Sequence, residues 1–262
     1  MAGRPRLGVF KLASCDGCQL QLLSCEDELL AIAGALEIAF FGEATSRKDD
    51  GGRYHVSLVE GSVSTAEQLE QLHDIRRRSD RLVAIGACAT AGGIQALRNW
   101  RDVDDMIRIV YATPSYIDTL ATSTPIADHV PVDFELRGCP IEKGQLVELI
   151  TALLVGRKPA IRDEAVCMEC KRSGATCVMV AHGTPCLGPV THAGCGALCP
   201  RFRRGCYGCF GPREQAATRS LSERFLADGV PADALVRKLR GFTAWAPAFR
   251  DESTRHDHGH DD

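Results

Sequence analysis

Cysteine is the residue that most constrains what this chain can fold into. The 262 residues include 13 cysteines, and eight of these fall between Cys167 and Cys209. A disulfide framework is typical of small secreted chains that cannot build a hydrophobic core. Here 45% of the residues are apolar, and the chain is long enough for a large domain. We therefore expect reduced thiols that hold metal ions or metal clusters.

Charge and hydropathy exclude several classes of partner. The chain has 31 Lys and Arg against 34 Asp and Glu, and this net charge of -3 predicts neither a nucleic-acid nor an anionic-membrane partner. No apolar run reaches the roughly 18 residues that a transmembrane helix requires. The first residues lead almost directly into a strand-like run without a secretory signal. We therefore expect a cytoplasmic protein.

Residues 1–158 alternate strand-like and helix-like segments. The strand-like segments are 6–13, 36–43, 54–61, 81–87, 107–112 and 130–136. The helical patterns are 19–35, 64–79, 92–100 and 143–155. Ser64 and Glu67 form a capping-box signature at the start of one of these helices. Because strands that alternate with helices form parallel sheets, this part predicts an α/β domain whose mostly parallel sheet is covered on both faces.

The rest of the chain has a different composition. Residues 159–215 are rich in Cys, Gly, Pro and Arg and contain few large apolar residues, so this domain should need metal to fold. A helical pattern returns in 216–249. The segment 250–262 is highly charged, and we expect a disordered tail.

Four cysteines of the N-terminal domain each follow a predicted strand. Cys15 and Cys18 come after the first strand, and Cys88 and Cys139 come after two later ones. The loops after parallel strands share one edge of the sheet, so these residues should converge on a four-thiolate site. Four thiolates suit either tetrahedral zinc or an iron–sulfur cluster, and a redox-active pair is a rival interpretation of Cys15 and Cys18 alone. Cys25 lies on a predicted helix, where we expect a small buried hydrophobe.

The eight C-terminal cysteines form two sets of four by sequence order. The first set is Cys167, Cys170, Cys177 and Cys186, and the second is Cys195, Cys199, Cys206 and Cys209. Two zinc-ribbon-like sites are one interpretation, and two iron–sulfur clusters are another. The division between the sets is also open, because the last cysteine of one run can bind the other cluster. Three such sites in one chain indicate a series of redox centres, or a zinc-stabilised scaffold in the alternative case.

These motifs together resemble a known family, the small subunits of nickel–iron hydrogenases, in particular the cytoplasmic, multimeric, NAD(P)-linked kind that includes sulfhydrogenase delta subunits. The matching segments are ASCDGCQLQLL, VSLVEGSV, AIGACATAGG, ELRGCPIEKGQ and the cysteine-rich segment that ends in GCYGCFGP. They span roughly residues 7–212. The family's Gly-Cys-Pro-Pro stands here as Gly-Cys-Pro-Ile, which keeps the ligand at Cys139.

The resemblance implies a flavodoxin-like first domain, a smaller irregular iron–sulfur domain and three [4Fe–4S] clusters. A proximal cluster would use Cys15, Cys18, Cys88 and Cys139. A distal cluster would use Cys167, Cys170, Cys177 and Cys186, and a medial cluster Cys195, Cys199, Cys206 and Cys209. Glu60 matches a family motif near the proximal cluster, where it would serve a proton path or be a carboxylate held by backbone amides.

The implied partners are a nickel–iron large subunit, which would carry the H₂ site, and a flavin and NAD(P)-binding subunit. A further iron–sulfur subunit is also compatible with the resemblance. An F420-linked, viologen-linked or respiratory-complex-like assembly is an alternative. Arg201, Arg203 and Arg204 lie between cysteines of the second set, where they would dock a partner, offset cluster charge or form a solvated face.

Overall fold

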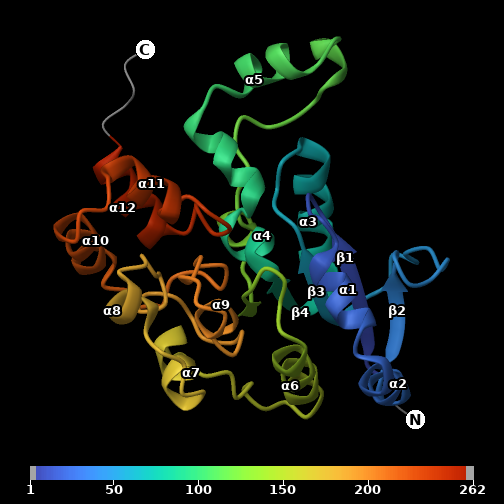
Figure 1. Cartoon of the computed structure of the whole chain (residues 1–262). Helices are drawn as coiled ribbons and strands as arrows, with labels where there is room; N and C mark the ends of the chain where they lie inside the picture. Colours follow the sequence, from blue (N-terminus) through green and yellow to red (C-terminus); the bar gives the residue numbers. More distant parts are fainter. Residues whose placement is uncertain (1–3, 258–262) are drawn as a thin grey trace. The chain divides into compact units, whose positions relative to one another are not determined.

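The computed structural model describes residues 4–257 (Figure 1). The chain divides into two compact units, Met1–Ile161 and Arg162–Asp262. The cysteine-rich segment and the C-terminal helices, which the sequence predicts as separate domains, fall together in the second unit. Within the described range, every helix is too short or too polar to cross a membrane.

The first unit is built on a five-stranded parallel sheet. Its strands are β1 (Arg6–Lys11), β2 (Glu37–Phe41), β3 (Tyr54–Glu60), β4 (Ser79–Ile85) and β5 (Phe134–Leu136). Their order in the sheet is β2-β1-β3-β4-β5, and each neighbouring pair is parallel. This is the flavodoxin order, which reverses direction between β1 and β3. The predicted fold class is therefore confirmed.

Helices cover both faces of this sheet. The α-helices are α1 (Gly17–Leu23), α2 (Glu26–Ala35), α3 (Ala66–Arg78), α4 (Gly86–Ala91), α5 (Val103–Val110) and α6 (Lys143–Leu154). Short 3-10 helices are η1 (Ile94–Trp100), η2 (Pro114–Tyr116) and η3 (Ile126–Asp128). Successive side chains of a strand point to opposite faces, so β4 contributes Val83 and Ile85 to one core and Leu82 and Ala84 to the other.

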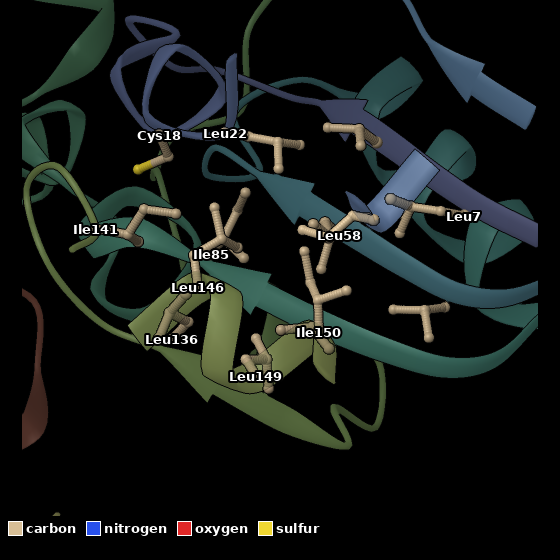
Figure 2. Close-up of a cluster of buried hydrophobic side chains, with 14 of the residues drawn as sticks. Leu7, Cys18, Leu22, Leu58, Ile85, Leu136, Ile141, Leu146, Leu149 and Ile150 are labelled. Carbon is tan, nitrogen blue, oxygen red and sulfur yellow. The ribbon is translucent and has the colours of Figure 1, made fainter. Parts of the chain in front are cut away.

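The first core lies between the sheet and helices α1, α2 and α6. Figure 2 shows Leu22 of α1 and Leu149 of α6 pointing toward the sheet residues Leu58 and Ile85. Cys18 lies at one end of this cluster and is 6% exposed. The second core packs α3, α4 and η3 against the opposite face.

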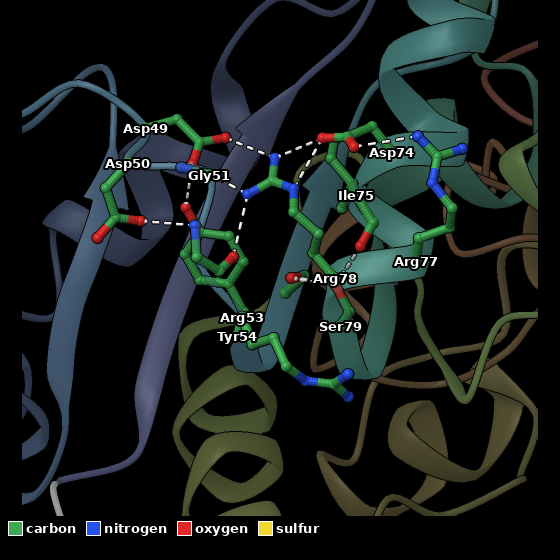
Figure 3. Close-up of polar contacts among 12 residues, drawn as sticks. Asp49, Asp50, Gly51, Arg53, Tyr54, Asp74, Ile75, Arg77, Arg78 and Ser79 are labelled. Atoms are coloured by element: carbon green, nitrogen blue, oxygen red, sulfur yellow. Dashed lines mark hydrogen bonds and ion pairs between the residues drawn. The ribbon is translucent and has the colours of Figure 1, made fainter.

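A polar network closes the end of the sheet where β3 and β4 begin (Figure 3). Arg78 donates to Asp49 at 2.6 Å and to Asp74 at 2.7 Å, and the Tyr54 hydroxyl donates to Asp49 at 2.6 Å. Burial opposes ionisation of Asp49, but the hydrogen bonds from Arg78 and Tyr54 lower its pKa overall. The network therefore ties the polar loop before β3 to the end of α3.

The strand that the sequence predicts over residues 107–112 is wrong, because most of this segment belongs to helix α5. The Asp102 side chain accepts hydrogen bonds from the backbone amides of Asp104 at 2.8 Å and Asp105 at 3.1 Å, which is a typical N-cap. The apolar run also lacks a place in the sheet, since Ile109 is 84% exposed.

Two predicted helices differ in detail. The pattern over 19–35 forms two helices, α1 and α2, and the fully buried Cys25 occupies the N-cap of α2. The cap of α3 lies one residue later than the capping-box signature predicts. Thr65 accepts from the Gln68 amide at 3.2 Å, and the Gln68 side chain accepts from the Ser64 amide at 2.9 Å.

The second unit contains short helices and long irregular stretches. Its helices are α7 (Val166–Arg172), α8 (Val178–His182), α9 (Leu198–Arg201), α10 (Thr218–Ala227), α11 (Ala232–Leu239) and α12 (Pro247–His256). Phe225, Leu235 and Phe249 of the last three helices join Cys186 and Cys206 in one buried cluster. The C-terminal helices therefore supply the large apolar side chains that the cysteine-rich segment lacks.

The expected disordered tail is wrong over residues 250–256, which belong to helix α12. One face of this helix is buried, because Phe249 is 1% and Glu252 3% exposed. The Glu252 carboxylate also accepts from Arg255 at 2.7 Å and lies 2.9 Å from His256. Residues 258–262 lie outside the described part of the chain.

Candidate metal centres

The first candidate centre lies at the carboxyl edge of the parallel sheet. Cys15 follows β1, and Cys18 lies in the first turn of α1. Cys88 lies in α4, directly after β4, and Cys139 follows β5. These loops flank the point between β1 and β3 where the strand order reverses, which is where open α/β sheets bind ligands.

These thiols are close enough to one another that the charge of one raises the pKa of the next. Burial raises the pKa of Cys18, and the charges of Glu60, Cys88 and Cys139 raise it further. Burial also raises the pKa of Cys88 to about 11, with contributions from Cys139 and Cys15. Burial and Cys15 raise the pKa of Cys139. Cys18, Cys88 and Cys139 therefore resist ionisation, and a bound metal ion would favour their thiolate forms, because metal coordination deprotonates thiols.

Two glycines leave the space that these sulfurs occupy. Gly86 has a φ of +86°, and a Cβ atom at this position would lie 2.3 Å from the Cys18 sulfur. Gly93 has a φ of +65°, and its Cβ would lie 2.5 Å from the Cys88 sulfur. Both residues form part of the GACATAGG segment. The site is therefore a cradle that any larger side chain at these two positions would fill.

Glu60 holds the start of helix α1. This last residue of β3 is 1% exposed, and its two carboxylate oxygens accept from the backbone amides of Cys18 and Gln19, each at 3.2 Å. Burial raises the pKa of Glu60. These contacts are the ones expected of a carboxylate held by backbone amides. The proton-path role of Glu60 stays a prediction.

Sequence reasoning missed Gln95, which links two loops of this centre. Its amide nitrogen donates to the Ala13 carbonyl at 2.8 Å, and its amide oxygen lies 3.5 Å from the Cys88 sulfur. The signal available in the sequence was its place two residues after GACATAGG.

The first C-terminal set converges within the second unit. Burial raises the pKa of Cys167 to about 11, with contributions from Cys186, Cys170 and Cys177. Gly188 lies beside two of these sulfurs, because its Cβ would lie 3.3 Å from that of Cys186 and 3.6 Å from that of Cys167. The four cysteines predicted as one set are therefore electrostatic neighbours.

The second set shows two pairs and two points of proximity to the first set, one of them between Cys195 and Cys170, whose pKa the charge of Cys195 helps to raise. Cys199 contributes to the raised pKa of Cys195, in which burial is the largest cause. Burial raises the pKa of Cys206 to about 12, and both Cys186 and Cys209 contribute. The Cys206 amide donates to the Cys186 sulfur at 3.1 Å. The two sets are therefore adjacent at Cys186 and Cys206.

Two charged residues support the C-terminal cysteines, and neither was singled out from the sequence. Glu169, between Cys167 and Cys170, accepts from the amides of Gly194 at 2.9 Å and Ala197 at 3.0 Å. It thus fixes the loop that carries Cys195.

The Lys238 ammonium group lies 4.9 Å from the centre of the Tyr207 ring. Burial lowers the pKa of Lys238, whereas the neighbouring sulfurs of Cys186, Cys206 and Cys199 raise it.

The chemistry of the donors bears on which metal group fits. All donors of the three sets are thiols, which are the usual ligands of iron–sulfur clusters and also bind structural zinc. Among residues 4–257, no three His, Cys, Asp or Glu side chains are gathered closely enough to hold a single metal ion.

Comparison with known proteins gives consistent relatives. The family model described as NADH ubiquinone oxidoreductase, 20 Kd subunit, matches residues 15–153. Sulfhydrogenase 2 subunit delta of Pyrococcus furiosus is 40% identical over 92% of this chain and 100% of its own length. A vhu subunit of the F420-non-reducing hydrogenase of Methanocaldococcus jannaschii is 31% identical over 80% of this chain and 83% of its own length.

Among solved structures, a chain of an NAD⁺-reducing [NiFe]-hydrogenase in the H₂-reduced state aligns with a TM-score of 0.56 and 32% sequence identity. The alignment covers 61% of this chain and 96% of that chain.

Proposed function

Because this chain belongs to the family of the NADH ubiquinone oxidoreductase 20 Kd subunit and is a hydrogenase small subunit, we propose that it conducts electrons between a nickel–iron large subunit and a flavin-bearing, NAD(P)-linked partner. When bound, three [4Fe–4S] clusters would supply the one-electron steps of this transfer. The site that reacts with H₂ would belong to the large subunit. A further iron–sulfur subunit is compatible with this arrangement.

One observation carries the proposal: three separate loops bring Cys15, Cys18, Cys88 and Cys139 to the edge of the sheet where its strand order reverses. We assign the proximal cluster to these four residues. The glycines beside the sulfurs, Gly86 above all, leave the space that the sulfurs of Cys18 and Cys88 occupy. Glu60 orients Cys18 by holding the amides at the start of α1.

We assign the other two clusters by sequence order. The distal cluster would use Cys167, Cys170, Cys177 and Cys186, and the medial cluster Cys195, Cys199, Cys206 and Cys209. The mutual electrostatic influence of the first four supports their grouping. The hydrogen bond from the Cys206 amide to the Cys186 sulfur is compatible with this division, because hydrogen bonds to sulfur tune the reduction potential of such clusters.

Chemistry and the relatives support the acceptor and the compartment that we propose. The solved relative is named as NAD⁺-reducing, which supports a nicotinamide-linked partner. All 13 cysteines are free thiols, which suits a reducing compartment, and we place the protein in the cytoplasm.

Purification without oxygen tests the assignment of the proximal cluster. The complex should contain about twelve irons and as many acid-labile sulfides per small subunit, with the electron paramagnetic resonance signals of reduced clusters. Cys18→Ala should lose about four of these irons and abolish H₂-dependent NAD(P)⁺ reduction, while the partner's own NAD(P)H–dye activity persists.

Cys25→Ala is the matched control. Cys25 is as buried as Cys18 but belongs to none of the three sets, and its sulfur contacts the Gln21 carbonyl at 3.3 Å. Its substitution should leave the iron content unchanged. Zinc in place of iron in the wild-type protein would contradict the electron-transfer function and favour a scaffold. Unchanged H₂-dependent reduction in Cys18→Ala would remove this centre from the electron path.

A further inference from the structure

Four basic side chains lie together on one part of the second unit. Unlike several other basic side chains of this unit, they form no ion pair with a carboxylate of the described residues. We call Arg201, Arg203, Arg204 and Lys238 the basic rim. No carboxylate among residues 4–257 forms an ion pair with any of them. By contrast, Arg219 pairs with Glu223 at 3.0 Å within helix α10. The rim therefore holds positive charge that the described part of its own chain does not neutralise.

The surface is hollowed on both sides of Arg203. One cavity of about 450 Å³ is lined by Arg201 and Arg203 together with Ser173 and Thr176. A second cavity of about 290 Å³ is lined by Arg203, Arg204 and Lys238. Concave positive surfaces concentrate the electric field, so they attract acidic groups more strongly than isolated cations do.

Apolar side chains stand exposed among these cations. Phe202 is 73% exposed, Leu198 is 54% exposed and Tyr207 is 44% exposed. Arginine and aromatic residues are enriched in protein–protein interfaces, where a few of them supply most of the binding energy. Cys177, an exposed member of the first cysteine set, lies between Thr176 and Val178, which line the first cavity together with Arg201 and Arg203.

We propose that the basic rim, with Phe202 and Leu198, docks an acidic face of the electron-accepting subunit and brings that subunit's redox centre close to Cys177 of the distal set. This inference rests on the proposed electron-transfer function and names the surface through which electrons leave. Charge complementarity selects the partner. The whole chain carries a net charge of -3, so an acidic partner is repelled by the chain as a whole and attracted at the rim.

The test uses the intact hydrogenase complex with the double substitution Arg201→Glu and Arg204→Glu. Like charges facing each other across an interface oppose binding strongly, so the affinity for the acceptor subunit should fall at least about tenfold. The measurement is the ratio of flavin to iron in the purified complex, followed over increasing NaCl concentration. The wild-type complex should lose its acceptor as salt rises, because salt screens exposed charges.

Arg219→Glu is the charge-matched control, since Arg219 lies on α10, lines neither cavity and is 72% exposed. It should retain the flavin at the wild-type level. The double variant Arg201→Gln with Arg204→Gln should lose less acceptor subunit than the charge reversal does. If the charge reversal also removes iron, this neutral variant provides the test of docking. The proposed docking surface would be wrong if both double variants keep the acceptor subunit and have the iron content and salt sensitivity of the wild type. Absence of iron from the wild-type complex would instead overturn the proposed function.

Discussion

Gly86 is the residue at which backbone conformation and site chemistry are most closely joined. Its φ of +86° lies in the region that glycine alone adopts without strain, and the missing side chain leaves the space of the Cys18 sulfur. It also begins helix α4, which carries Cys88. One small residue therefore allows two of the four thiols to approach each other.

Gly86→Ala should displace the Cys18 sulfur and remove the proximal cluster. The added methyl group would lie 2.3 Å from that sulfur, in addition to the backbone strain at positive φ. Iron analysis should show a loss of about four irons per chain. Gly34→Ala is the control, because nothing lies within 4 Å of its added methyl group. A full complement of iron in Gly86→Ala would contradict this role.

Lys238 is a second residue whose charge acts on the cysteines. Its pKa is lowered by burial and raised by Cys186, Cys206 and Cys199, so its ammonium group lies near sulfurs of both C-terminal sets. A nearby positive charge favours the reduced, more negative form of a cluster.

Lys238→Met should therefore make a C-terminal cluster harder to reduce, lowering its midpoint potential by tens of millivolts, on the order expected for one charge in a partly buried site. An anaerobic redox titration followed by electron paramagnetic resonance measures this potential. Lys238→Arg, which keeps the charge, should stay close to the wild type. Equal potentials in Lys238→Met and the wild type would show that the charge does not reach the clusters.

At the scale of elements, side-chain caps decide where helices begin. Asp102 starts α5 in a segment whose apolar residues favour a strand, and Thr65 starts α3 one residue after the signature in the sequence. In both cases the side-chain oxygen accepts a hydrogen bond from an amide that the helix leaves free. Local hydrogen bonds thus override the pattern of apolar residues.

Thr65→Ala should weaken the first turn of α3 by about 1 kcal/mol, or a factor of about five in amide exchange. Glu67→Ala should have a smaller effect, because Glu67 is exposed and acts on the helix only through its charge. Hydrogen exchange of the complex, followed by mass spectrometry of the peptide over residues 64–72, measures both. A larger effect of Glu67→Ala would restore the capping box that the sequence predicts.

At the scale of the whole molecule, the two units are stabilised by different means. The first has apolar cores on both faces of its sheet. The second has one apolar cluster, and Cys186 and Cys206 are part of it. We therefore predict that metal binding would contribute more to the folding of the second unit, as in other small domains whose ligands join their core.

Removal of iron by a chelator under anaerobic conditions should unfold the second unit first. Amides in 164–213 should lose protection from hydrogen exchange, while those of β1, β3 and β4 keep it, because their cores contain no C-terminal cysteine. Complex incubated without chelator provides the reference. Simultaneous loss of protection in both units would mean that the clusters stabilise the chain as a whole.

Much of this protein follows from sequence alone. The apolar strands and intervening helices predicted the parallel α/β sheet, and the cysteines that follow three strands predicted a site at one edge of it. The resemblance to hydrogenase small subunits is confirmed by the relatives. The fold prediction succeeds because strand alternation is set by short segments and the order of parallel strands by topology, whereas the metal site at the edge of the sheet stays a prediction.

Only the tertiary structure decided the rest. The clearance at Gly86, the anchoring of Cys18 by Glu60 and the position of Lys238 beside Cys186 each join residues far apart in the chain. The same holds for α12, whose charged sequence suggests disorder until Phe249 is seen buried. Such contacts depend on which surfaces meet when the elements pack, and packing is a property of the folded chain rather than of any local segment.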